Sequence, residues 1–155
     1  MRSYQHPLFL LYKTRGYCLR VSLYGTLYSM KQLILSILPE KLGICHLDKD
    51  SPIPQWATES KFFSITKTGD ELSIICLQEN IPGGVLSEKD WRAFKVEGPL
   101  GFSLTGIVSS LATPLANANI SILYVSTYET DYLLVEEKTF GKAVQILSKS
   151  CTIRQ

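Results

Sequence analysis

The sequence predicts an α+β protein, and three features of residues 91–136 carry that prediction. Between Trp91 and Glu97 the residues alternate with the period of a strand. After a Gly/Pro turn at residues 98–101, apolar residues recur every three or four positions, which is the period of a helix with one apolar face. Two runs rich in branched and aromatic residues then flank a short turn, as in a β-hairpin.

The first helix is predicted to start near Phe102 and to present one apolar face. That face consists of Leu104, Ile107, Val108, Leu111 and Leu115. Pro114 lies near the end of the pattern, where it removes a backbone donor and costs roughly 3 kcal/mol if it is interior. We therefore expect a kink or an early end of the helix there.

The hairpin that follows consists of residues 120–127 and 131–136, separated by Tyr128, Glu129 and Thr130. A second helix is predicted to begin with Thr139 as its N-cap. This start places four apolar residues on one face, namely Phe140, Ala143, Val144 and Leu147. The predicted order is strand, helix, strand, strand, helix.

The first half of the chain predicts mostly strands. Residues 31–38 and 43–47 are apolar runs, and residues 61–67 and 71–77 flank a Thr-Gly-Asp turn as a second hairpin. Residues 48–56 contain two prolines, which exclude a regular helix across both, so we expect a loop with one helical turn at Trp56. Residues 78–90 have little periodicity and are interpreted as a linker.

A shift of 60 residues relates the two hairpins and two prolines that end strands. The matched positions are Ile65-Thr66 with Val125-Ser126, Glu71-Leu72 with Asp131-Tyr132, Ile74-Ile75 with Leu134-Val135, and Pro39 with Pro99. Because short hydrophobic strands also align by chance, two copies alone leave an internal repeat and a coincidence equally open.

The first 29 residues differ from the rest in charge. They hold four basic residues and no acid, so the remainder of the chain has 12 basic and 14 acidic residues, which argues against a nucleic-acid footprint. Their apolar run at residues 8–12 is shorter than the core of a signal peptide, about 7–15 residues. Three interpretations stay open: upstream noncoding sequence translated from a misplaced start, with Met30 as the functional start; a loosely docked tail; or a membrane-surface anchor. We regard residues 1–29 as a doubtful leader.

Motifs for catalysis are missing from the sequence. It has no P-loop, no GxGxxG after a strand and no GxSxG. Cys45 and His46 are neighbours on a predicted strand, so they point to opposite faces and cannot act together, and Cys76 is predicted to be a buried, inert thiol. We therefore predict no enzyme, no catalytic residue, no metal and no cofactor. Four cysteines without a CxxC pair and without a targeting signal predict a reducing cytoplasm.

Residues 96–137, which read VEGPLGFSLTGIVSSLATPLANANISILYVSTYETDYLLVEE, resemble the ACT-domain family. That family comprises regulatory modules with a ferredoxin-like βαββαβ fold that bind amino acids. From about Met30 onward the chain is similar to a small stand-alone branch with two ACT-like units, which includes cytosolic arginine sensors; the motifs GPL, STY and TDYLLV carry this similarity. The resemblance implies tandem ACT-like units: a degenerate one at residues 30–84, whose helices are replaced, and an ACT domain at 85–155, whose last strand is residues 151–154.

The resemblance also implies a ligand site. In the sensors, ligand lies where strands of one unit meet the glycine turn of another. The matching positions are Gly98, Pro99, Leu100, Gly101, Phe102, Ser103, Ser126, Thr127, Tyr128, Thr130 and Asp131. Backbone N–H groups at the positive start of a helix suit a carboxylate, and the carboxylate of Asp131 suits an ammonium or a basic side chain. Which residue belongs to which side of a shared pocket stays open.

Structural alternatives accompany these assignments. In one alternative, the sole role of Gly98 and Gly101 is to make a tight turn. In the same way, the sole role of Asp131 could be to satisfy the backbone of the hairpin. Two functions follow: a regulatory module in which a free amino acid changes the affinity for a protein partner, or a scaffold that dimerises through sheet edges or helix faces without a small molecule. The predicted partners are thus an amino acid of unknown identity, a protein and a second copy of the chain, with no nucleic acid and no membrane.

Overall fold

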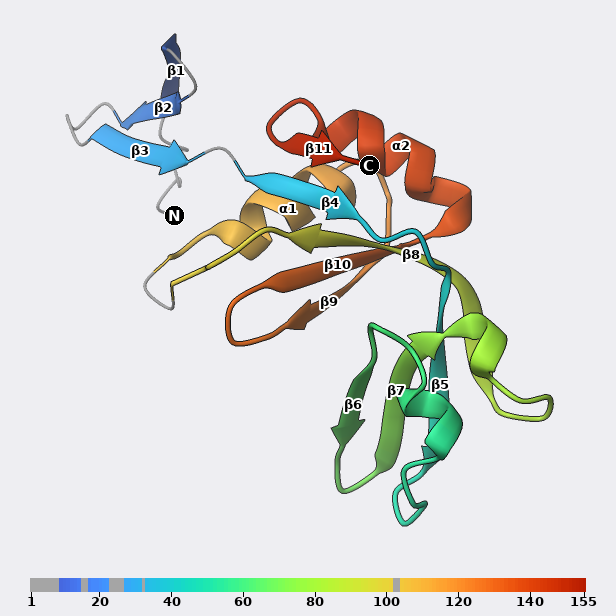
Figure 1. Ribbon diagram of the computed structural model, residues 1–155. Helices are drawn as coiled ribbons and strands as arrows, with labels where there is room; N and C mark the ends of the chain where they lie inside the picture. Colours follow the sequence, from blue (N-terminus) through green and yellow to red (C-terminus); the bar gives the residue numbers. More distant parts are fainter. Residues whose placement is uncertain (1–8, 15–16, 23–26, 32, 102–103) are drawn as a thin grey trace, which may run out of the picture.

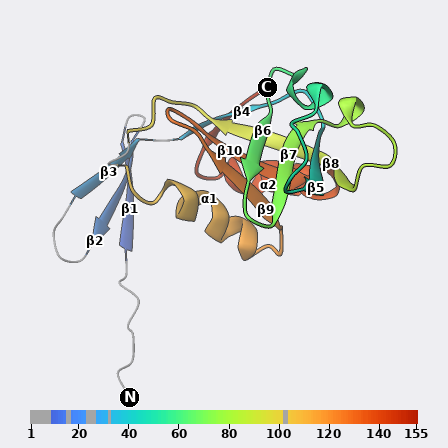
Figure 2. The ribbon, with the colours of Figure 1, turned by 90° about the horizontal axis from the view of Figure 1, so that it is seen from below.

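The computed structural model describes residues 9–14, 17–22, 27–31, 33–101 and 104–155, and these residues form two sheets. The smaller sheet is antiparallel and consists of β1 (Phe9–Thr14), β2 (Tyr17–Ser22) and β3 (Leu27–Lys31). It lies apart from the larger sheet in Figures 1 and 2. The sequence analysis predicted no strands in residues 1–29, so these strands are a correction. Among the described residues, no helix has the length and apolar character that crossing a membrane requires.

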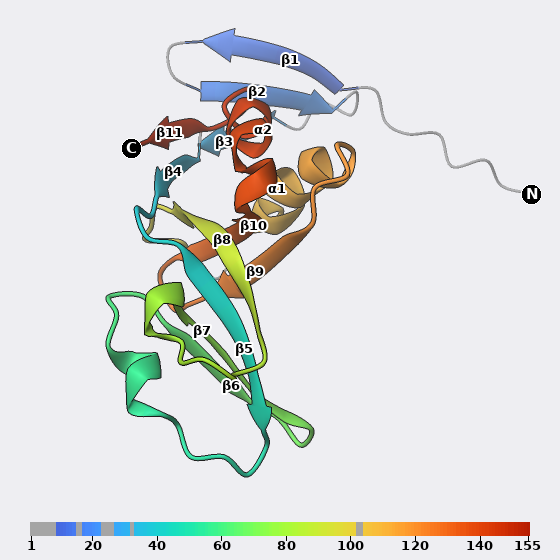
Figure 3. The same cartoon turned by 90° about the vertical axis from the view of Figure 1, so that its right-hand side faces the viewer.

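The larger sheet is organised around β8 (Ser87–Val96), which pairs along both of its edges. On one edge lie β4 (Ile34–Ile37) and then β5 (Leu42–Asp48), both antiparallel to β8. On the other edge lies β10 (Asp131–Glu136), which pairs onward with β9 (Ile122–Ser126). The two halves of the chain therefore share one strand (Figures 1 and 3).

Three more strands complete this sheet. β7 (Glu71–Leu77) pairs with β5 and with β6 (Ser64–Lys67), so the hairpin predicted in the first half is confirmed. β11 (Thr152–Arg154) is the predicted short last strand, and it pairs in parallel with β4. Because β4 lies between them, β11 does not pair with β8.

Two helices cover one face of the sheet in the second half. They are α1 (Ile107–Ala116) and α2 (Glu137–Leu147), which lie side by side in Figures 1 and 3. Their apolar faces meet the sheet in a core that includes Phe94, Leu133 and Leu111, all fully buried. The predicted face of α2 lies in or against this core, and the rings of Phe94 and Phe140 stack with centroids 4.9 Å apart. The strand, helix, hairpin and helix predicted for this half are confirmed.

Both helix starts differ from the prediction. α1 begins at Ile107, so Leu104 precedes it and is 55% exposed, and Val108 is 45% exposed instead of facing the core. The helix continues only two residues beyond Pro114, in keeping with the expected early end. α2 begins at Glu137, so Thr139 lies in its first turn, where its hydroxyl donates to the carbonyl of Glu136 instead of capping the helix.

Short 3₁₀ turns stand where helices occur in the second half. η1 (Gln55–Thr58) provides the helical turn expected at Trp56, and η2 (Gln78–Asn80) begins the predicted linker, which ends earlier than expected because β8 starts at Ser87. These turns cover a second core that contains Ala57, Ile74 and Cys76. A third cluster, with Ile75, Ala93 and Leu134, joins the two halves on the other face of the sheet.

The two hairpins match with a shift of one residue less than predicted. Lys67 and Leu72 bracket the first turn and Ser126 and Asp131 bracket the second, so the shift is 59 residues. Since neighbouring strand residues point to opposite faces, this correction exchanges the faces that are compared. Asp131 corresponds to Leu72, and not to Glu71.

Candidate functional site

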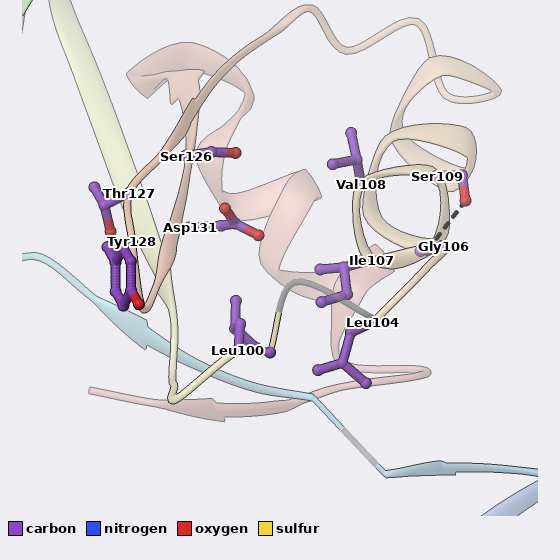
Figure 4. Close-up of a pocket in the computed structure, with 11 residues that line it drawn as sticks. Leu100, Leu104, Gly106, Ile107, Val108, Ser109, Ser126, Thr127, Tyr128 and Asp131 are labelled. Atoms are coloured by element: carbon purple, nitrogen blue, oxygen red, sulfur yellow. Dashed lines mark hydrogen bonds between the residues drawn. The ribbon is translucent and has the colours of Figure 1, made fainter.

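A pocket of about 430 Å³ lies between the start of α1 and the turn end of the β9–β10 hairpin (Figure 4). Three segments line it: the loop after β8, the first turn of α1 and the hairpin. The lining residues are Leu100, Gly101, Leu104, Gly106, Ile107, Val108, Ser109, Ser126, Thr127, Tyr128 and Asp131. All three segments belong to the second half of the chain, whereas the resemblance implied strands and glycine turn from different units.

Asp131 provides the acidic group of the pocket. Its backbone pairs with Ser126 on one side and with Val96 on the other, which places it at the first position of β10. Asp131 and Ser126 point from the hairpin toward α1 in Figure 4. The Asp131 carboxylate oxygen Oδ2 accepts a hydrogen bond of 2.9 Å from the Tyr124 hydroxyl. Burial, reinforced by this hydrogen bond and the negative charge of Asp131, raises the pKa of Tyr124 above its usual range.

The side of the first turn of α1 that carries Ile107 and Val108 faces this carboxylate (Figure 4). Gly106 is the N-cap, its φ of 83° lies in the left-handed region that favours glycine, and no side chain caps the helix. The N–H groups of the first helical turn have no intrahelical acceptors and carry the positive end of the helix dipole. The hydroxyl of Ser109 donates to the Gly106 carbonyl, which leaves those N–H groups to other acceptors.

Gly98 supports the pocket from outside. A Cβ atom on this residue would lie 2.2 Å from the carbonyl oxygen of Glu129, so a side chain would collide with the hairpin turn. The Leu100 N–H donates to the same carbonyl at 2.8 Å. These contacts attach the loop after β8 to the hairpin, so Gly98 has a structural role there, and neither Gly98 nor Pro99 lines the pocket.

The hairpin turn is closed by Thr127 and Thr130. The Thr127 N–H donates to the Thr130 carbonyl, and the Thr127 hydroxyl accepts from the Thr130 N–H at 3.2 Å. The two threonine side chains also contact each other at 3.0 Å. Threonine side chains therefore satisfy this turn, and the carboxylate of Asp131 bonds to Tyr124 instead. The alternative in which Asp131 closes the hairpin is wrong.

The structure brings six of the predicted site residues together in the pocket: Leu100, Gly101, Ser126, Thr127, Tyr128 and Asp131. Gly98, Pro99 and Thr130 lie outside its lining, and Phe102 and Ser103 lie outside the described residues. Sequence reasoning missed Leu104, Gly106, Ile107, Val108 and Ser109 as lining residues, because it assigned the three apolar ones to a buried helix face. Gly106 was the available signal, since a glycine is a common residue at a helix start.

The cysteine and histidine side chains considered in the sequence analysis do not form a second site. Cys45 and Cys76 are both buried, and burial with Cys45 beside it raises the pKa of the Cys76 thiol to about 12. His46 points to the opposite, exposed side of β5, as predicted, and contacts Glu71 at 2.8 Å. In the part of the chain that the structure describes, no three His, Cys, Asp or Glu side chains gather in a way that could hold a metal ion.

Comparison with protein families matches both halves of the chain. Residues 86–149 match a model described as an ACT domain, and residues 40–84 match a model described as an N-terminal domain. Among curated proteins, the human cytosolic arginine sensor for mTORC1 subunit 1 is 36% identical over 107 residues, which are 64% of this chain and 32% of that protein. The match thus spans about a third of the length of this curated relative.

Solved structures give the same assignment. Protein Atu0741 from Agobacterium tumefaciens is 39% identical, with a TM-score of 0.76 over 81% of this chain and 94% of that one. The regulatory subunit of aspartate kinase from Thermus thermophilus is 11% identical with a TM-score of 0.56, over 75% of this chain and 95% of that one, and therefore shares the fold alone. Together with the ACT model, these matches show that the chain belongs to the ACT-domain family.

Proposed function

We propose that the chain is a non-catalytic regulatory module, and that a free amino acid binds in the pocket between α1 and the β9–β10 hairpin. One observation carries the proposal: the Asp131 carboxylate and the uncapped first turn of α1 line the same pocket. The first pairs with an α-ammonium group and the second with an α-carboxylate. A curated relative supports this function, because it is named as a cytosolic arginine sensor.

The energy required is modest. A dissociation constant near 1 μM corresponds to about 8 kcal/mol, which is about 0.8 kcal/mol for each of roughly ten heavy atoms of an amino acid. Very small ligands reach up to about 1.5 kcal/mol per heavy atom. Backbone donors at α1, the Asp131 carboxylate and the apolar wall of the pocket suffice for such an affinity.

A protein partner would bind at the mouth of the pocket, with an affinity that depends on whether an amino acid occupies the pocket. Three lining residues, Leu104, Val108 and Tyr128, are exposed there and present apolar surface. A partner that docks over this surface would contact the same hairpin and first turn of α1 that the amino acid contacts, which couples the two binding events. We place this regulation in the cytoplasm, as for the cytosolic sensor, with residues 30–84 as a degenerate structural unit and 85–155 as the ligand-binding ACT domain.

Thermal shift of the full chain with each of the twenty amino acids tests the proposal. A ligand at 100 times its dissociation constant adds roughly 2.7 kcal/mol, enough to raise the melting temperature by several degrees. Asp131→Asn should remove the shift, whereas Glu129→Gln, a change of the same charge in the same hairpin but outside the pocket lining, should keep it. A folded protein that responds to no amino acid at millimolar concentration would refute amino-acid binding by this chain.

The second candidate function is a dimerising scaffold, and one observation favours it. Within the described residues β9 pairs only with β10, so its other edge is open, and its sequence ILYVS contains neither charge nor proline. Such an edge is suited to pairing with a strand of another chain. Light scattering coupled to size exclusion distinguishes the two functions: the scaffold requires a dimer that Asp131→Asn and every amino acid leave unchanged.

A further inference from the structure

We infer that the pocket selects an amino acid with an uncharged aliphatic side chain over one with a basic side chain. The inference rests on the proposed function and concerns the charge balance of the same pocket. Among the described lining residues, Asp131 is the only one with a carboxylate or a cationic side chain.

One carboxylate balances one cation. The Asp131 oxygen Oδ2 already accepts from the Tyr124 hydroxyl at 2.9 Å, which leaves Oδ1 as its oxygen without a donor among the described side chains. The α-ammonium group that every amino acid carries takes this acceptor. A second cation on the ligand, such as the terminal group of lysine or arginine, then has no anionic partner in the lining, and an unpaired charge next to apolar surface is strongly disfavoured.

The other acidic residue of the hairpin turn, Glu129, does not provide an anionic partner for a second cation on the ligand. Glu129 is exposed and does not line the pocket. Its contact with the site is made by its backbone carbonyl, which holds the Leu100 N–H. A basic ligand would therefore have to recruit its counter-charge from outside the pocket.

The rest of the lining favours an aliphatic side chain. Leu104, Ile107 and Val108 supply aliphatic side chains opposite Asp131 and Ser126, and Leu100 supplies a fourth beside Asp131 (Figure 4). Leu104 and Val108 are about half exposed, so a ligand side chain that covers them removes apolar surface from water. A polar head group at Asp131 and α1, with an aliphatic tail on these residues, uses both walls of the pocket.

Norleucine and lysine form the probe pair, because they differ only by the terminal ammonium group. With the full chain, isothermal titration calorimetry should give norleucine and leucine a dissociation constant at least about tenfold below that of lysine and arginine, within the 10–200-fold range of hydrophobic discrimination. Tighter binding of lysine or arginine would overturn this inference and leave the proposed function intact. Binding of neither class would overturn this inference, and only a thermal-shift screen without a response to any of the twenty amino acids would overturn the proposed function as well.

Val108→Asp provides the converse test, because it adds a second acid to the lining. Position 108 is in the first turn of α1 and partly exposed, where an aspartate is compatible with the helix dipole. The variant should bind lysine more tightly and norleucine more weakly than the native chain, while Val108→Asn, of nearly the same size without the charge, should leave lysine binding weak. An unchanged ratio of lysine to norleucine affinity in Val108→Asp would contradict charge balance as the cause.

Discussion

The two hairpins of this chain have the same turn geometry but different surroundings. In β6–β7 the Thr68 N–H donates to the Glu71 carbonyl at 2.9 Å, and in β9–β10 the Thr127 N–H donates to the Thr130 carbonyl at the same distance. The next residue is Leu72 in the first hairpin, 1% exposed, and Asp131 in the second, half-buried beside a pocket. A single position thus separates a filled core from a polar site.

The element packed over each hairpin explains the difference. Leu72 belongs to the core that includes Ala57 of η1, which closes over the first hairpin. Over the second hairpin lies the first turn of α1, whose uncapped start and preceding loop leave about 430 Å³ unfilled. Of the two hairpins, the second has both an acid at this position and the first turn of a helix lining the same pocket, which makes it the candidate binding site.

The largest effect in our predictions comes from the core next to the second hairpin. Phe94→Ala removes a fully buried ring that stacks on Phe140, and we expect a loss of about 3–5 kcal/mol in the free energy of unfolding. Ile74→Ala, in the core of the first hairpin, should cost about 2–5 kcal/mol.

Urea denaturation followed by circular dichroism and by tryptophan fluorescence measures both losses. Because β8 pairs with β5 and β10, we expect each variant to unfold in a single transition of both halves. Two separated transitions in either variant would show that the halves fold independently. The two hairpins could then not be compared as parts of one cooperative structure.

The next largest effect comes from replacing one glycine in each half of the chain. Gly98→Ala forces a Cβ against the Glu129 carbonyl, 2.2 Å away, and should destabilise the protein by about 1–3 kcal/mol and weaken amino-acid binding by displacing the loop from the hairpin. Gly69→Ala, in the turn of the first hairpin, meets no atom within 4 Å and should change the free energy of unfolding by less than about 0.5 kcal/mol. Chemical denaturation measures both variants, and equal losses would contradict the assigned role of Gly98.

Local patterns predicted the hairpins well. Residues 71–77 and 131–136 match the bounds of β7 and β10, because branched residues on either side of a polar turn define a strand without reference to the rest of the chain. The predicted Asp131 carboxylate and two residues of the predicted loop, Leu100 and Gly101, also line one pocket.

Long-range arrangement could not be predicted in the same way. The insertion of β4 between β8 and β11 depends on pairing between distant segments, which no local period contains. The start of α1 was placed too early because the spacing of Leu104 and Val108 mimics a buried face, although both side chains are exposed at the mouth of the pocket. Exposed apolar residues that line a pocket have the same sequence pattern as core residues.

The smallest effect concerns the hydrogen bond between Asp131 and Tyr124 of the neighbouring strand β9. Tyr124→Phe removes the hydrogen bond to Asp131, and because Tyr124 is only half-buried we expect a loss of about 1 kcal/mol below pH 9. The pKa of Tyr124 is raised in the folded protein by burial and by Asp131, so the folded state holds this proton more tightly than the unfolded chain, whose tyrosines titrate near about 10. This contribution is therefore complete below pH 10 and is lost as the pH rises toward the pKa of the folded state.

The measurement is the free energy of unfolding of the native chain and of Tyr124→Phe between pH 7 and pH 11. The gap between them should narrow above pH 10, with Tyr132→Phe, which removes a hydroxyl from the other face of the same hairpin, as the control. A gap that widens with pH would mean that Asp131 does not hold the phenol in its protonated form. Because Leu72 occupies the matching position of the first hairpin and has no such partner, a confirmed narrowing would identify the Tyr124–Asp131 pair as a property of the pocket and not of the repeated hairpin.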